Sequence, residues 1–522
     1  MQIPLSLKIK QYTKKSLFVA TLIFVFSSIF RIFYLDLIEF KYDEAYTVFQ
    51  LVQFYNNPYL MQVGPPQSTG VFNPPLFNYI MIVLSFISRS PQFLSFMIAL
   101  VSTISILVFY FVIKKLQGQK TALFASLLLS LSPWSIIFSR KIWIPDILLP
   151  FSVILFYLFY KYVIEKDNIV TKRFFASLAL LPQMHASGLF FLISTIPILF
   201  IYRRKIAWKN AIIGFCLGLI PAVPYFYRQF SSTPFCIDCQ TLFSYNNQVR
   251  TFDFANFLRP FEIVSALNWQ VLLGNNHQDF WLNLPISPLF NVIFVLQGLT
   301  LLGGIFVILK YKQKFIPLAF YLALIPFLYL ITKTPSYMHY FVVLFPMLFF
   351  ISAQFFVFLY EKGKIWKIIS VALLLFFLTS NFVFEINFYE FLSNKKIIDG
   401  DYGPIYSETQ KLVDEQTSKY SQLSNFTELK NYTYMFAGPK IINAKLGEYF
   451  AQVGQVNFAI DEFQKSLEIN PKDISSRANL TYIYILTGKT SNARNQLDIL
   501  SSQDSTISAK LKEMLLQKEK QK

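Results

Sequence analysis

The chain has 522 residues, of which 54% are hydrophobic and only 15% are charged, and 59 of them are Phe. This composition excludes a soluble globular domain and a disordered chain, and it indicates a polytopic membrane protein. A formal net charge of +18 would suggest nucleic acid for a soluble protein, but here the basic residues lie in short clusters between apolar runs. Such clusters are typical of cytoplasmic loops, so we expect a lipid bilayer and no nucleic acid as the partner.

The apolar runs predict eleven membrane spans. They lie near 17–35, 92–113, 120–139, 147–164, 174–188, 189–202, 210–228, 288–309, 314–332, 338–360 and 366–384. The basic residues of 8–15 run directly into the first span, so we expect a retained helix and not a removed signal peptide. If every basic cluster is cytoplasmic, the chain is a multi-pass protein of the cell membrane with its N-terminus inside and its C-terminal part outside.

Two segments decide this topology. Residues 76–88 lie between prolines and are short of the ~20 residues that a span needs, so we expect an interfacial or re-entrant helix. The segment 174–202 has basic residues at both ends and is interrupted by Gln183, His185 and Ser187. It predicts two short or broken helices, because polar backbone within a membrane is tolerated where it lines a cavity.

With this topology, the unusual polar residues gather on the outer face. They are Asp43, Glu44, Asn73, Arg140, Lys141, Asp146, His185 and His339, together with the long loop 229–287. A transporter more often places such residues near the midplane, between two matching halves, and no internal symmetry is present. In the outer loop, Cys236 and Cys239 predict a local disulfide.

After residue 385 the composition becomes polar, and residues 443–510 carry a repeat. Leucine, glycine and alanine recur 34 residues apart, as in Leu446/Leu480, Gly454/Gly488 and Ala459/Ala493. This period is typical of tetratricopeptide repeats, which are helix–turn–helix units. We expect a connecting segment at 385–442, the repeats at 443–510 and a charged tail at 511–522. The repeats either bind a protein partner or cover the outer loops.

Four landmarks carry a family resemblance. They are Tyr42-Asp43-Glu44-Ala45; Asn73-Pro74-Pro75-Leu76; Ser139-Arg140 followed by Pro145-Asp146; and Ser336-Tyr337-Met338-His339-Tyr340 before Phe345-Pro346. Over about residues 1–384 the chain resembles the GT-C membrane glycosyltransferases that use lipid-linked sugars, in the protein O-mannosyltransferase and aminoarabinose transferase branch. Asn73 stands where that pattern has His. The resemblance implies an all-α polytopic domain of about eleven transmembrane helices, here followed by a small helical repeat domain.

The resemblance also implies a reaction. A monosaccharide would pass, with inversion, from a polyprenyl-phosphate donor to an extracytoplasmic acceptor, which can be a protein, a lipid or a glycan. Because phosphate is a good leaving group, one carboxylate base and one cationic phosphate clamp should suffice. We assign the base to Asp43 and the clamp to Arg140 and Lys141. Glu44 is a hydrogen-bond or metal partner, and Asp146 orients the clamp or binds the acceptor.

Four further residues are candidate ligands of the donor. His185 and His339 face the outer side but could equally be packed histidines. Asn73 could bind sugar or phosphate or be a turn residue before proline, and Tyr337 could be an aromatic of the membrane interface. With three histidines in the chain, a multi-His metal site is not expected, and a divalent cation is the only cofactor considered.

Two other classes of function remain open at this point. One is a polytopic transporter or flippase of lipid-linked saccharides. The other is a membrane-anchored scaffold that acts through its repeats.

Overall fold

The computed structural model describes residues 5–67, 71–202, 205–232, 236, 238, 252–438 and 441–520, with side chains from residue 17 onward. Within these residues the chain is helical and has no strand, and its β pairings are isolated bridges such as Glu39 with Ile405. Two compact units divide the chain. The first, the membrane unit, comprises Met1–Glu39 and Asn57–Ile405; the second, the tail unit, comprises Phe40–Asn56 and Tyr406–Lys522.

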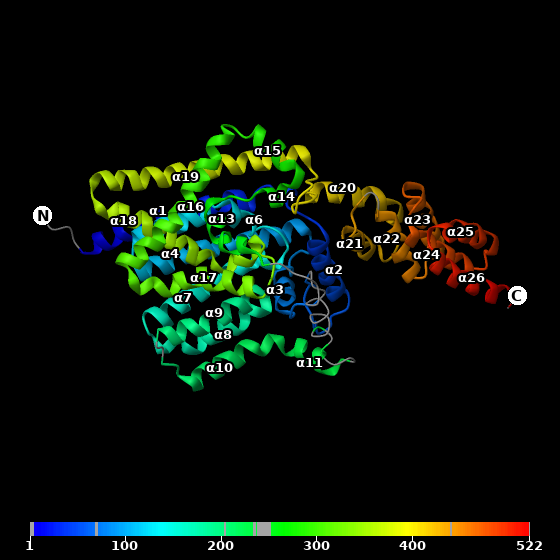
Figure 1. Ribbon diagram of the computed structural model, residues 1–522, viewed down its shortest axis with the longest axis horizontal. Coiled ribbons are helices and arrows are strands. Elements are labelled where there is room, and N and C mark those ends of the chain that lie inside the picture. The colour runs from blue at the N-terminus through cyan, green and yellow to red at the C-terminus, as the bar shows by residue number, and fades with distance from the viewer. Residues whose placement is uncertain are drawn as a thin grey trace. The chain divides into compact units, whose positions relative to one another are not determined.

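The membrane unit is a bundle of helices (Figure 1). Its α-helices are α1 (Leu5–Ile32), α3 (Leu76–Leu84), α4 (Pro91–Gln117), α5 (Gln119–Ser130), α6 (Pro133–Ile137), α7 (Leu148–Phe159), α8 (Thr171–Met184), α9 (Ser187–Ile201), α10 (Trp208–Leu219), α11 (Val223–Ser231), α13 (Arg259–Ser265), α14 (Gln270–Leu273), α15 (His277–Asn283), α16 (Ser287–Tyr311), α17 (Ile316–Ile331), α18 (Phe345–Lys362) and α19 (Lys364–Lys395). Seven helical stretches of the described chain are long and apolar enough to cross a bilayer, and two shorter apolar helices lie at Leu17–Ile32 and Ser187–Ile201. The protein is therefore a membrane protein.

Each of the eleven predicted spans contains a helix, while the number of true crossings stays a prediction. The segment 174–202 forms two helices, α8 and α9, which meet at His185, as its polar interruption predicted. The prediction for 120–139 was too long, because α5 ends at Ser130 and α6 starts at Pro133. Proline has no backbone N–H and disfavours a helical residue before it, and Ser132 is extended here, with φ −67° and ψ 123°, so the helix is interrupted before Pro133.

Glycines permit close approach of two pairs of membrane helices. A Cβ atom on Gly304 of α16 would lie 2.0 Å from the carbonyl oxygen of Ile351 in α18. A Cβ atom on Gly214 of α10 would lie 2.2 Å from the carbonyl oxygen of Lys172 in α8. Only glycine allows helix backbones to come this close.

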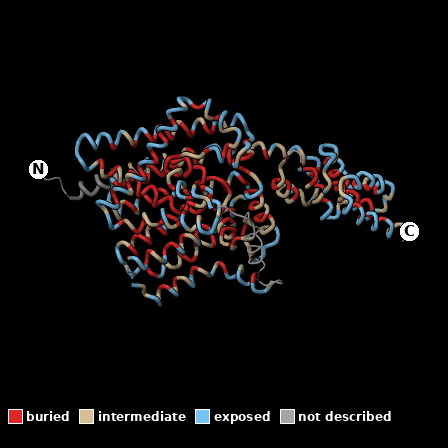
Figure 2. The backbone as a smooth tube through the Cα atoms, viewed as in Figure 1, coloured by how far each residue is buried: buried red, intermediate tan, exposed pale blue. Residues whose placement is uncertain are grey.

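The tail unit combines one early helix with the C-terminal part of the chain. Its helices are α2 (Tyr42–Asn56), α20 (Tyr406–Thr417), α21 (Phe426–Tyr434), α22 (Ile442–Gln452), α23 (Val456–Ile469), α24 (Ile474–Leu486), α25 (Thr490–Gln503) and α26 (Ser505–Lys520). One apolar core extends from Tyr420 and Leu429 to Leu515. Figure 2 shows buried backbone on the inner faces of its helices. Helix pairs occupy the region predicted to carry tetratricopeptide repeats, and that repeat identity stays a prediction.

The cysteines and the boundary between the units complete the description of the fold. Cys236 is disulfide-bonded, and the partner predicted for it, Cys239, lies outside the described residues together with part of the loop 229–287. Cys216 in α10 is a free thiol. The sequence placed a domain boundary near 384, but α19 continues as one helix to Lys395, and the membrane unit continues to Ile405.

Candidate functional site

The loop between α6 and α7 is organised by the carboxylate of Asp146. Its Oδ1 accepts the backbone N–H groups of Arg140 and Lys141, each at 3.0 Å. The backbone N–H of Asp146 donates to the carbonyl of Trp143 at 3.2 Å, and the side chain of Asp146 is completely buried. Asp146 therefore fixes, through backbone groups, the loop that carries both predicted cations. Its role in orienting a phosphate clamp stays a prediction.

Lys141 lies at the centre of the polar residues that the membrane unit brings together. Its Nζ is 2.8 Å from Oε2 of Glu39 and 3.9 Å from the ring centre of Trp143. Lys141 is 8% exposed and Glu39 is 3% exposed, so the ion pair is largely removed from water. A buried charge needs such a partner, because desolvation of an unpaired ion is costly. Glu39 was not among the residues that the sequence indicated.

Arg140 points away from this pair. Its guanidinium donates to the carbonyl oxygens of Phe30 and Tyr34 and to the hydroxyl of Tyr389, and it lies 4.6 Å from the ring centre of Tyr389. The last carbonyl groups of a helix have no partner within that helix, and a cation there also favours the helix dipole. Arg140 thus binds the end of α1, whereas Lys141 pairs with Glu39. The two residues predicted to form the phosphate clamp therefore have different partners.

A group of aromatic and histidine rings adjoins Lys141. The ring centre of His339 is 4.5 Å from that of Trp143 and 5.6 Å from that of Tyr337. His185 is 5.7 Å away from His339, measured between ring centres. Three residues predicted to bind the donor, His185, Tyr337 and His339, therefore lie together near Lys141. His185 comes from the α8–α9 junction, and the other two lie at the start of the short helix Met338–Leu344.

The protonation of His185 follows from its neighbours. The backbone N–H of Ser187 donates to Nδ1 of His185 at 3.2 Å, and the hydroxyl oxygen of Ser187 is 2.9 Å from the same nitrogen. Since Nδ1 accepts the backbone N–H, the neutral imidazole carries its proton on Nε2. That Nε2–H group is the donor that His185 can offer to a ligand.

Asn73 has a local task in the loop before α3. Its amide nitrogen donates to the carbonyl of Pro65 at 2.9 Å, and its amide oxygen accepts from the side chain of Gln67 at 2.9 Å. Both ends of the buried amide are used inside the loop, which agrees with the turn role considered for Asn73. The structure does not bring Asn73 into the group around Lys141.

Asp43 and Glu44 belong to the tail unit, in the first turn of α2. Asp43 is exposed, whereas Glu44 is buried and its Oε2 accepts the backbone N–H of Lys41 at 2.9 Å. A glutamate that reaches back to the residue before a helix is one half of a capping box, and acidic residues are also favoured in a first helical turn. Glu44 therefore secures the start of the helix that presents Asp43.

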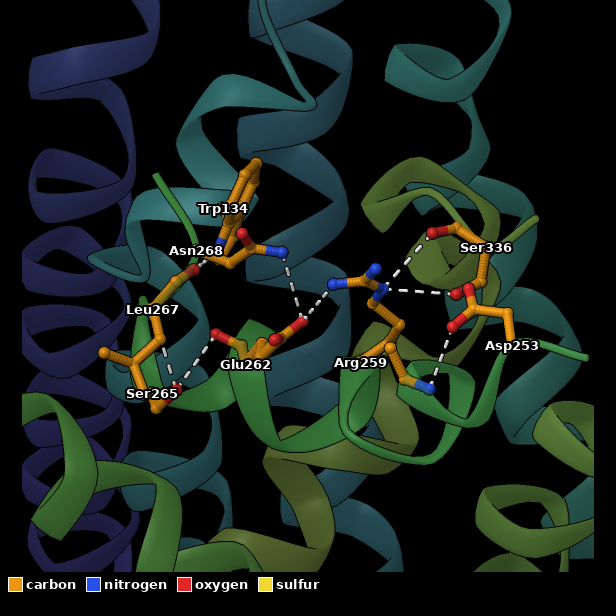
Figure 3. A network of polar contacts seen from close by, with 9 residues as sticks. Trp134, Asp253, Arg259, Glu262, Ser265, Leu267, Asn268 and Ser336 are labelled. Carbon is orange, nitrogen blue, oxygen red and sulfur yellow. Dashed lines mark hydrogen bonds and ion pairs between the residues drawn. The ribbon is translucent and has the colours of Figure 1, made fainter. Parts of the chain in front are cut away.

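A second polar network was not found from the sequence. Figure 3 shows Arg259 between Glu262 and Ser336. Its Nε donates to the carbonyl and hydroxyl oxygens of Ser336 at 3.2 and 3.1 Å, and its Nη1 is 2.7 Å from Oε2 of Glu262. Arg259 thus ties α13 of the outer loop to the residue just before Tyr337. The sequence did contain a signal for Arg259, because this arginine comes directly before a proline at a helix start, in a loop otherwise poor in cations.

No three His, Cys, Asp or Glu side chains gather among the described residues in an arrangement that could hold a metal ion. A divalent cation therefore has no group of ligands assigned to it within that part of the chain.

Known proteins resemble the chain in part of its sequence and in its fold. Residues 73–227 match the family model described as Dolichyl-phosphate-mannose-protein mannosyltransferase. No curated protein sequence matches the chain. The structure of ArnT from Cupriavidus metallidurans in the apo state has a TM-score of 0.50 at 10% identity, over 81% of this chain and 85% of that one.

The oligosaccharyltransferase of Archaeoglobus fulgidus in the apo form has a TM-score of 0.46 at 14% identity, over 81% of this chain. The match covers 60% of the archaeal chain. Together, the family model over 73–227 and the fold shared with ArnT show that this membrane protein resembles the GT-C glycosyltransferases, as its four sequence landmarks predicted.

Proposed function

We propose that the protein transfers a monosaccharide from a polyprenyl-phosphate donor to an extracytoplasmic acceptor, with inversion at the anomeric carbon. The observation that carries this proposal is the group around Lys141, a largely buried cation that lies beside the rings of Trp143 and His339. The segment 73–227 contains this loop, and the name of the family that it matches includes a lipid-phosphate sugar donor. The orientation that we propose puts these residues on the side opposite the cytosol.

The proposed chemistry is a single displacement. The acceptor oxygen or nitrogen attacks the anomeric carbon, the bond from that carbon to the phosphate oxygen breaks, and its electron pair leaves with the phosphate. The acceptor proton passes to the carboxylate of Asp43, which acts as general base. Lys141 holds the phosphate and stabilises the negative charge that grows on it, a task for which a fixed cation is suited. Since Lys141 supplies this charge, the scheme is complete without a metal ion.

Glu39 gives Lys141 a partner while no donor is bound. When the donor binds, its phosphate would take the place of the Glu39 carboxylate or contact Lys141 beside it. The positive charge of Lys141 therefore has a negative partner both before and after donor binding. Asp43 follows Glu39 by only four residues in the sequence. This short separation along the chain supports the assignment of Asp43 as the base.

The rings next to Lys141 would bind the donor sugar. His185 offers an Nε2–H donor, and Tyr337, which is exposed, offers an aromatic face beside His339. Arg140, Asp146 and Asn73 act in this proposal by holding the loops in place, because their side chains form hydrogen bonds to other groups of the protein.

The test is the pair of variants Asp43→Asn and Asp36→Asn. Both remove one exposed carboxylate from the same short segment, and Asp36 has no role in the proposal. We expect both proteins to insert and fold, and to bind a radiolabelled polyprenyl-phosphate mannose. Asp43→Asn should lose transfer by ~10²–10⁴-fold, the usual contribution of a general base, while Asp36→Asn keeps it. Wild-type turnover by Asp43→Asn would end the base assignment.

The same protein in liposomes separates an enzyme from a flippase of the donor. Movement of the labelled lipid between leaflets without any transfer or hydrolysis of its sugar would support the flippase. Sugar transfer with the lipid confined to one leaflet would support the enzyme.

A further inference from the structure

The start of α2 is anchored by a buried aromatic side chain of the tail unit. The ring of Phe40 is completely buried, with its centre 5.1 Å from that of Tyr406 and 5.5 Å from that of Tyr434. Both contacts are edge-to-face, the arrangement that aromatic pairs favour. The hydroxyl of Thr409 donates to the carbonyl oxygen of Phe40 at 3.3 Å. The residue that begins the segment leading to Asp43 is therefore held by α20 and α21.

Further ring contacts continue along α2. The ring centre of Tyr42 lies 5.9 Å from that of Phe436, and the ring centre of Phe49 lies 6.2 Å from that of Tyr432. Tyr432 also contacts Tyr449 of α22, with 5.1 Å between ring centres. One aromatic side chain of α21 thus touches both the acidic helix and the first of the helices in the predicted repeat region.

The rest of the tail unit is packed continuously behind these contacts. Leu429 of α21 shares one apolar core with residues of α22 to α26. The buried carboxylate of Glu462 in α23 accepts hydrogen bonds from the hydroxyl of Tyr420 and the amide of Asn443, each at 2.7 Å. The acidic helix is therefore the first layer of a unit that extends to the C-terminal helices.

We propose that the tail unit is the positioning element of the acidic helix, and that Tyr406 and Tyr434 are positioning residues for the carboxylate of Asp43. This inference rests on the proposed function, because it takes Asp43 as the base. A 15-residue helix is marginal alone in water, so the place of α2 depends on what packs against it. Asp43 is three residues from Phe40, and a displacement of ~1 Å at a reacting group can cost ~10²-fold in rate.

One consequence concerns truncation of the chain. Removal of Tyr406–Lys522 removes the packing partners of α2 as well as the predicted repeats. Loss of sugar transfer after such a deletion therefore does not distinguish a scaffold from an enzyme whose base has been displaced.

The experiment uses the full-length protein in nanodiscs and the variants Tyr434→Ala, Tyr434→Phe and Tyr482→Ala. Tyr434→Ala removes one wall of the Phe40 site, and Tyr434→Phe keeps the ring. Tyr482 of α24 is an exposed tyrosine of the same unit and serves as a surface control. Hydrogen exchange of residues 42–56 reports the packing of α2, and exchange of residues 442–503 reports whether the rest of the tail unit is folded. Sugar transfer from polyprenyl-phosphate mannose is measured alongside.

We expect faster exchange in α2 and a loss of kcat on the order of 10²-fold for Tyr434→Ala, with little change in the KM for the donor. Tyr434→Phe should restore both quantities, and Tyr482→Ala should match the wild type in both. If Tyr434→Ala unfolds residues 442–503, Phe40→Leu loosens the same contact from the side of α2, and the same results are expected.

Unchanged exchange in α2, or faster exchange with a wild-type kcat, would overturn the inference. An equal effect of Tyr482→Ala would also overturn it, because it would show a general loss of stability. The fate of the proposed function is read separately from Asp43→Asn. If that variant is active, the base assignment fails, while the exchange of α2 still decides whether the tail unit holds the helix.

Discussion

Substitution of Asp146 separates a loop-holding role from a role of its charge. Asp146→Ala deprives two buried backbone N–H groups, those of Arg140 and Lys141, of their acceptor. A buried donor without a partner costs about 1–3 kcal/mol, so the Ala variant should lose about 2–6 kcal/mol. That is a large part of the roughly 5–15 kcal/mol that stabilises a typical folded protein.

Asp146→Asn keeps the acceptor that the two N–H groups use. Oδ1 remains an amide oxygen, and the new NH₂ group replaces Oδ2, which has no hydrogen-bond partner in the described part of the protein. The two hydrogen bonds weaken because the acceptor is neutral, but the variant no longer buries a carboxylate. We expect a loss of about 2 kcal/mol or less.

The assay is thermal unfolding of the purified protein in one detergent, combined with sugar transfer by the same preparations. The expected order of unfolding temperature is wild type, then Asn close to it, then Ala clearly lower, with transfer by the Asn variant within about tenfold of wild type. An Asn variant as unstable as Ala would refute the hydrogen-bond account. A stable Asn variant without transfer would show that the charge of Asp146 acts in the reaction.

Three further outcomes are expected. Lys141→Met removes the ion pair of the buried Glu39 and should cost about 3–5 kcal/mol. The double variant with Glu39→Met should recover stability in thermal unfolding but not sugar transfer. Gly304→Ala should lower the unfolding temperature, because its Cβ would meet backbone of α18. Burial opposes the charge on Glu462, but hydrogen bonds, led by that from Lys419, hold its pKa below the ordinary 4.5. Because that pKa is lower in the folded state, this stabilisation is complete above about pH 4.5 and is lost as the pH falls further. Hydrogen exchange of α23, corrected for its intrinsic pH dependence, should therefore show acid destabilisation that is smaller in Glu462→Gln.

Hydropathy predicted the helices of the membrane unit because apolar length and helix length are tied by the thickness of the bilayer. The polar interruption at Gln183, His185 and Ser187 also predicted the junction of α8 and α9. The end of α5 was missed for a physical reason. Hydropathy counts apolar side chains, and the run through Pro133 is apolar, but a helix also needs backbone N–H donors.

The division of the chain into units could not be read from the sequence. Phe40 and Tyr406 are far apart along the chain, and an aromatic contact between them leaves no periodic pattern in either segment. The sequence therefore placed the acidic motif with the membrane domain that precedes and follows it. In the same way, the pairing of Lys141 with Glu39 depends on tertiary contacts, and neither residue type indicates the other.

Arg140 and Lys141 have different partners because their side chains differ in shape and in the number of hydrogen-bond donors. Arginine suits phosphate oxygens well, which is why the sequence favoured it as the clamp. Its several planar donors also suit a set of carbonyl oxygens, and the end of α1 presents such a set at Phe30 and Tyr34. A lysine ammonium is a compact charge that can exchange one carboxylate for one phosphate. Arg140 joins the loop of Lys141 to the chain that leads to Glu39, so the residue best suited to bind phosphate instead holds together the two segments that carry the ion pair.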